Sequence, residues 1–153
     1  MRFRKLKQQK QDKKPSKVKI LYAKYPDRVK ALITDMFMIY MPIMFLITYA
    51  FLGGKDELQD STIAPMIATI IYGVIYALFL SKTGQTPGKK AYGIKVVIYK
   101  TQEKVSFFMG IWRFIAFLIS ATSIVGLLLP FFRKDNKALH DLLSSTIEII
   151  EDK

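Results

Sequence analysis

Two charged residues stand in or beside a long apolar stretch, and they are the first candidates for chemistry. In the string RVKALITD, Arg28 and Asp35 fall on one face of a helix, roughly 10.5 Å apart along its axis. An ionisable group inside a membrane-spanning helix costs at least about 2.5 kcal/mol, so it normally faces a partner, a cavity or a pathway. Asp35 is therefore the best functional candidate.

Arg113 is the other charged residue buried within an apolar segment. Two interpretations of Asp35 stay open. In the first, Asp35 takes part in moving ions across a membrane; in the second, it forms a pinning ion pair, for instance with Arg113, that holds the fold together. A carboxylate and a guanidinium suffice for a neutral pair, but they make a sparse ion pathway.

His140 and Asp141 are neighbours in ALHDLLSS. Histidine titrates near neutrality, so the pair could transfer protons, but sequence neighbours on a helix do not face each other. The favoured role of Asp141 is to cap or anchor the helix before the last predicted strand, with Arg28 or the 84–90 turn as a partner.

The string KTGQTPGKKAYGIKVV contains Gly84, Gly88 and Lys89, which superficially resemble a phosphate-binding loop. The spacing is too short, Lys90 replaces the Ser or Thr that should follow the lysine, and no strand precedes the loop. Nucleotide binding is not expected. The glycines instead predict a structured turn at the membrane surface, with Lys89 and Lys90 toward lipid phosphates.

The composition excludes several classes of site. The 153 residues contain no cysteine and one histidine, so disulfides, thiolate metal sites and histidine-rich metal sites are excluded. No paired carboxylates and no nucleophile beside a base are evident. We expect no enzyme activity, no metal and no cofactor.

Apolar residues collect in three blocks, at about 29–52, 62–80 and 107–132, and nearly all charge lies between them. A membrane span needs roughly 20 apolar residues. The buried helices of a soluble bundle would show a polar face, and these blocks show none. The sequence therefore predicts an all-α membrane protein.

Charge asymmetry predicts the orientation. Residues 1–30 hold twelve Lys or Arg and two Asp, 53–61 hold one Lys and three acids, and 81–106 hold six Lys and one Glu. Because basic segments stay on the cytoplasmic side, the first and third segments are expected inside and the second outside. We expect two full spans in the cytoplasmic membrane of a bacterium.

The basic tail over residues 1–19 is predicted to be disordered, leaving 20–153 as one membrane domain. Lysine neutralises phosphate on any molecule, but a tail joined to a span is better placed to contact lipid. We expect the bilayer and anionic phospholipid head groups to be partners of 1–30 and 82–104, and no nucleic acid.

The third apolar block, 107–132, is flanked by basic residues on both sides and has a weak centre at SATS followed by Gly126. Both flanks are therefore expected inside, as in a broken or re-entrant segment. The β-branched strings at 93–99 and 145–151 predict two short strands that pair in the cytoplasm, because each alone would leave its backbone groups unpaired.

Three strings, RVKALITD, GQTPGKKAYGIKVV and LHDLLSSTIEII, together resemble the RDD family of bacterial membrane proteins over about residues 22–150. The family is named for one arginine and two aspartates. The resemblance implies that Arg28 and Asp35 match the arginine and the first aspartate, and that Asp141 matches the second. The chain departs from the family pattern at Pro87, usually leucine, and at Ser144 and Ser145, commonly Ala-Gly.

The resemblance implies a multi-pass membrane protein, with ligand transport proposed for the family. We expect an internal polar cluster of Arg28, Asp35, Arg113 and Asp141 that sums to zero charge. The first expectation for function is a transporter or transporter subunit that acts as a homo-oligomer or with another membrane protein. The alternative is a membrane anchor or accessory protein whose charged cluster is structural.

Overall fold

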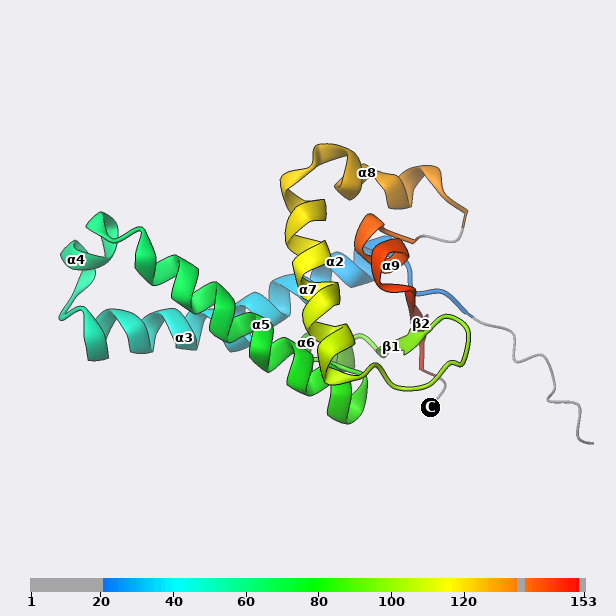
Figure 1. Ribbon diagram of the computed structural model, residues 1–153, viewed down its shortest axis with the longest axis horizontal. Helices are drawn as coiled ribbons and strands as arrows, with labels where there is room; N and C mark the ends of the chain where they lie inside the picture. The colour runs from blue at the N-terminus through cyan, green and yellow to red at the C-terminus, as the bar shows by residue number, and fades with distance from the viewer. Residues whose placement is uncertain (1–20, 135–136, 152–153) are drawn as a thin grey trace, which may run out of the picture.

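The computed structural model describes residues 21–134 and 137–151. Its longest feature is a pair of helical runs, Tyr25–Phe51 and Ile63–Thr83, which cross each other (Figure 1) and are in contact along residues 36–51 of the first run. The first run comprises α2 (Tyr25–Asp35), α3 (Met41–Leu46) and the π-helical segments Met36–Tyr40 and Ile47–Phe51. The second run is α5 (Ile63–Thr83), and the short helix α4 (Lys55–Asp60) lies at the turn between them. The basic tail expected over 1–19 lies outside the described residues.

The first π-helical segment ends where Pro42 enters the helix. Proline has no backbone N–H, so the regular hydrogen-bond pattern is interrupted there, and a π-helical turn is one way to continue the helix. The run therefore stays helical through Phe51 despite the proline.

Both runs are long and apolar enough to cross a membrane. Their outward-facing side chains are also apolar: Phe45 on α3 and Ile70 on α5 are 63% and 64% exposed. A water-soluble helix would place polar residues at such positions. Lipid is the environment in which this surface is favourable, and the prediction of two full spans is confirmed.

The third apolar block forms two helices, α7 (Phe107–Thr122) and α8 (Ile124–Phe132), which meet at Ser123 with a bend of 111°. Gly126 permits this bend, because a Cβ there would lie 2.7 Å from the Ser120 hydroxyl and 2.8 Å from its carbonyl oxygen. The prediction of a broken third segment is confirmed, and α8 turns back over α9 (Leu139–Ser144) (Figure 1).

The two predicted strands pair as expected. β1 (Ile94–Ile98) and β2 (Thr146–Ile150) are antiparallel, with Ile94 opposite Ile150 and Ile98 opposite Thr146. The short helix α6 (Pro87–Ala91) leads into β1, and α9 leads into β2. The sheet therefore closes the end of the molecule opposite α4 (Figure 1).

Small residues let α7 pack closely on α5. A Cβ on Gly110 would lie 3.0 Å from the Cα of Ala77, and a Cβ on Gly73 would lie 2.5 Å from the ring of Phe114. Small residues at helix contacts in membranes allow such close approach. This contact places Arg113 of α7 beside the sheet end of the molecule, where it is fully buried.

Candidate functional site

Three cationic side chains surround the buried carboxylate of Glu148 on β2. They are Arg28 (Nε–Oε2, 2.8 Å), Arg113 (Nη2–Oε1, 2.6 Å) and Lys89 (Nζ–Oε1, 3.0 Å). Burial opposes ionisation of this group, but the three cations hold the pKa of Glu148 well below its usual range. Glu148 is therefore a permanent negative charge inside the protein.

Asp141 is the second acid at this position and shares two of the same cations. Its Oδ1 lies 2.6 Å from Nη1 of Arg113, and its Oδ2 pairs with Nη2 of Arg28. Burial alone would raise its pKa, but the two guanidinium groups lower the pKa of Asp141 to about 2. Its Oδ2 also accepts a hydrogen bond of 3.1 Å from the N–H of Ala138, at the start of α9. The predicted capping role and the contact with Arg28 are both present.

Five elements thus meet in one buried charge network, which comprises Arg28 (α2), Lys89 (α6), Arg113 (α7), Asp141 (α9) and Glu148 (β2). The hydroxyl groups of Thr146 and Ser144 accept further hydrogen bonds from Arg113. Because each charge has a partner on another element, the network ties the helices to the sheet. A charge left alone in this position would be strongly destabilising.

Asp35 lies outside this network. Its Oδ2 accepts a hydrogen bond of 2.5 Å from the hydroxyl of Thr86, and its Oδ1 accepts one of 2.7 Å from the N–H of Gly88. Within the described ranges, no cationic group comes within ion-pairing distance of Asp35. Of the two interpretations of Asp35, the ion pair with Arg113 is not formed, because Asp141 on α9 and Glu148 on β2 bind the two terminal nitrogens of the Arg113 guanidinium.

The turn at 84–90 differs in one respect from its expected form. Lys89 does not point toward lipid phosphates; it is buried, and its ammonium binds Glu148. The reason is that a buried carboxylate attracts any cation that can reach it. Lys90, by contrast, is exposed.

The two glycines of this turn have different structural roles. Gly84 ends α5 in the left-handed conformation (φ 73°), which glycine adopts without strain. A Cβ on Gly88 would lie 2.1 Å from the carbonyl oxygen of Ala31 and 2.9 Å from the carboxylate of Asp35. Gly88 is thus what lets α6 touch α2 and donate its N–H to Asp35.

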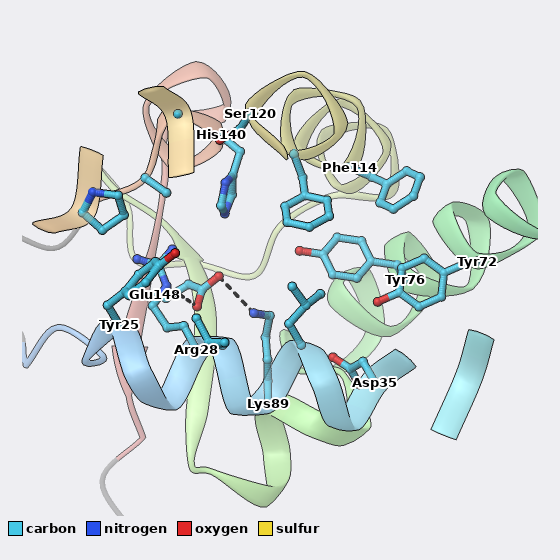
Figure 2. A pocket seen from close by; sticks show the side chains of 16 residues that line it. Tyr25, Arg28, Asp35, Tyr72, Tyr76, Lys89, Phe114, Ser120, His140 and Glu148 are labelled. Carbon is cyan, nitrogen blue, oxygen red and sulfur yellow. Dashed lines mark hydrogen bonds and ion pairs between the residues drawn. The ribbon is translucent and has the colours of Figure 1, made fainter. Parts of the chain in front are cut away.

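A cavity of about 80 Å³ lies between Asp35 and the buried charge network. Figure 2 shows Lys89 between Arg28 and Asp35, with its nitrogen toward Glu148, and Tyr72, Tyr76 and Phe114 on the opposite side. The lining also includes Phe117, Ser120 and His140. The cavity is therefore mainly apolar, with several aromatic rings in its lining, and has charged groups along one side.

His140 lies beside the network, with its Nε2 3.6 Å from Oδ1 of Asp141. Burial lowers the pKa of His140 to about 4, although Asp141 opposes this shift. His140, Asp141 and Glu148 could together offer ligand atoms to a metal, since these atoms lie within 4.8 Å of one another. Both carboxylates already bind arginine, however, so a metal ion would have to displace those cations. The residues present do not fit a metal.

Glu148, Thr86 and Thr146 were not singled out from the sequence. Thr146 and Glu148 are two residues apart on β2, so they point to the same side of the strand, and both contact Arg113. Alternation of polar and apolar residues was the one available signal, and it does not distinguish a face toward water from a face toward buried arginines.

The fold and the site define a helical membrane protein with two spans, a broken third segment and an internal set of balanced charges. The model of the RDD family matches residues 22–145, which is most of the chain, and the chain belongs to this family. No curated protein and no solved structure matches it.

Proposed function

We propose that this protein transports a solute across a membrane, alone or as a subunit of a transporter, with Asp35 as the group that changes its charge during the cycle. The observation that carries the proposal is the difference among the three acids that are buried in the described part of the chain. Asp141 and Glu148 are each held by two or more cations, whereas Asp35 is held by a hydroxyl and an amide. A buried carboxylate with neutral partners can gain and lose a proton without breaking a direct ion pair.

The cavity supports the same role. Asp35 is 1% exposed, yet it lines the cavity. A proton or solute in the cavity could thus reach Asp35, while the buried charge network keeps the surrounding elements in place. A chain with two or three spans can hardly enclose a pathway alone, so the transporting unit is an oligomer or a complex with another membrane protein.

The exposed lysines suggest which side of the membrane the sheet faces. Lys82 is exposed in the last turn of α5, and Lys90, Lys100 and Lys104 are exposed in the segment that joins α5 to α7. By the positive-inside rule this segment lies in the cytoplasm, where its lysines would contact anionic phospholipids. We assign the protein to the cytoplasmic membrane of a bacterium on this argument.

Proton flux in proteoliposomes tests the transport proposal. Asp35→Asn keeps the size of the side chain and an acceptor oxygen, so the contacts with Thr86 and Gly88 can persist. Asp27→Asn is the matched control, since Asp27 lies on the same helix but is exposed. We expect flux from the wild type and from Asp27→Asn, and none from Asp35→Asn.

Equal flux from the wild type and Asp35→Asn, or no flux from any folded variant under any imposed gradient, would overturn the proposal. The second outcome would favour the alternative function, a membrane anchor or accessory protein whose charges are structural. The fully paired state of Asp141 and Glu148 is the observation that favours this alternative.

A further inference from the structure

The cavity has the size of a small molecule. A single water needs roughly 10–15 Å³ of such space, and a cavity of about 150 Å³ in another protein holds benzene. A cavity of about 80 Å³ therefore has room for a molecule of a few non-hydrogen atoms. Phe114 and Phe117 line it, so part of the occupant should be apolar.

Two hydroxyl groups in the cavity lining have unmet hydrogen-bonding capacity. Tyr72 and Ser120 are 7% and 1% exposed, and neither hydroxyl bonds to another residue in the described part of the chain. Buried polar groups are normally hydrogen-bonded, so unpaired ones in a cavity indicate where a ligand would be bound. Figure 2 shows both residues at the cavity.

The charges beside the cavity do not balance within the buried charge network. It contains three cations and two acids, and so has one excess positive charge, which Asp35 offsets without direct contact. Lys89 is the cation of the network on α6, and it lines the cavity. Its ammonium has three N–H donors, one of which is directed to Glu148. If Asp35 gains a proton, the described residues of the network and cavity keep one excess positive charge, which an anion in the cavity would offset.

We propose that the cavity binds a small monocarboxylate, such as propionate, together with a proton on Asp35. The carboxylate would bind the Lys89 ammonium and the free hydroxyls, and the alkyl part would pack on Phe114 and Phe117. The proton and the anion enter as a neutral pair, so the total charge of the site is unchanged. This inference rests on the proposed function and names its substrate class.

The groups around Asp35 favour an anion over a cation. Asp35 interacts electrostatically with Lys89 on α6, Glu148 on β2 and Tyr72 on α5. Arg28 lies on the same helix as Asp35. A cation at Asp35 would meet Lys89, and both oxygens of Asp35 already accept hydrogen bonds. An anion at Lys89 meets neither of these two obstacles once Asp35 is neutral, and the charge of Glu148 nearby is offset by Arg28 and Arg113.

Calorimetric titration of the purified full-length chain in detergent tests the inference, with propionate as ligand from pH 6 to pH 9. We expect millimolar binding that weakens as the pH rises, by up to about tenfold per pH unit, because one proton is bound with each anion. Asp35→Asn should bind propionate independently of pH. Propylammonium, of similar size and opposite charge, should not bind.

Variants of cavity residues test whether propionate binds in this cavity and not elsewhere on the protein. Lys89→Met should lose binding, while Lys90→Met, the exposed neighbour, should bind as the wild type does. Because Lys89→Met also removes a partner of Glu148, Tyr72→Phe serves as a second variant: it deletes a hydroxyl without a partner and should weaken binding several-fold with the fold intact.

Absence of propionate binding at every pH overturns the inference, and so does wild-type affinity for propionate in both Lys89→Met and Tyr72→Phe. Binding of propylammonium in place of propionate, or binding of chloride as tightly as propionate, also overturns it. If these occur while Asp35-dependent proton flux persists, the substrate class is wrong and the transport proposal stands. If propionate binds with its proton but no flux is found, the site stands and transport does not.

Discussion

The guanidinium of Arg113 on α7 and the carboxylate of Glu148 on β2 form an ion pair of 2.6 Å between a helix of the apolar region and the sheet. Both side chains are almost fully buried, and Glu148 also binds Arg28 and Lys89. Among the acids in the described part of the chain, Glu148 therefore has the most cationic partners.

Replacing this acid should unfold much of the sheet end. Glu148→Gln leaves three buried cations with Asp141 as the remaining acid of the network, and breaking a buried pair costs about 3–5 kcal/mol. We expect a large fall in the thermal unfolding midpoint in detergent. Glu151→Gln is the control, because Glu151 lies just after β2 but is exposed and should leave the midpoint nearly unchanged. Equal midpoints for the two variants would contradict the role given to Glu148.

Gly88 should be intolerant of even one added carbon. Its Cβ would lie 2.1 Å from the carbonyl oxygen of Ala31, so Gly88→Ala must push α6 away from α2. Overpacking of this kind costs about 1–3 kcal/mol. Lys90→Ala, at an exposed position of α6, should cost much less. A Gly88→Ala protein as stable as the wild type would show that α6 can move without loss.

The membrane helices and the strand pairing could be predicted because their signals are local. The apolar blocks, the weak centre before Gly126 and the β-branched strings each lie within one short segment. Arg28 and Arg113 stood out for a similar reason, since a charge inside or next to an apolar segment needs a partner. Asp141 stood out through its neighbour His140 and through the family resemblance.

The partners themselves depend on tertiary packing, and here the sequence was insufficient. The sequence allows an ion pair between Asp35 and Arg113, but the packing of α2 on α6 directs Asp35 to Thr86 and Gly88. Lys89 stands next to exposed Lys90 in the sequence, and only the fold shows that it is buried against Glu148. Glu148 was missed because a glutamate in a short strand usually faces water.

Ser145 adopts a left-handed conformation (φ 53°) at the end of α9. Glycine adopts this conformation without strain, so Ser145→Gly should stabilise the protein by about 0.5–1 kcal/mol. A small rise in the thermal unfolding midpoint would show this, and Ser145→Val should lower it. Gln102 has a similar φ of 57° and is exposed, so Gln102→Gly should give a similar rise. A fall with Ser145→Gly would mean that the serine hydroxyl stabilises the turn.

His140 should make the protein less stable as the pH falls from neutrality. Its pKa is lowered by burial to about 4 in the folded state, whereas an unfolded histidine titrates near 6.5. Between these values the unfolded chain binds a proton that the folded chain does not, so folding is favoured above pH 6.5 and this stability is lost as the pH falls toward 4. The full effect is about 3 kcal/mol at most, from about 1.4 kcal/mol per pKa unit.

The variant His140→Gln isolates this effect, because glutamine does not titrate. Asp141, whose pKa is about 2, stays ionised throughout the range from pH 7 to pH 4.5. Unfolding by denaturant in detergent should therefore show a wild-type stability that falls over this range and a His140→Gln stability that falls less. Parallel pH profiles for the two proteins would mean that His140 is accessible to protons in the folded state, and that its contact with Phe117 does not keep it buried and neutral.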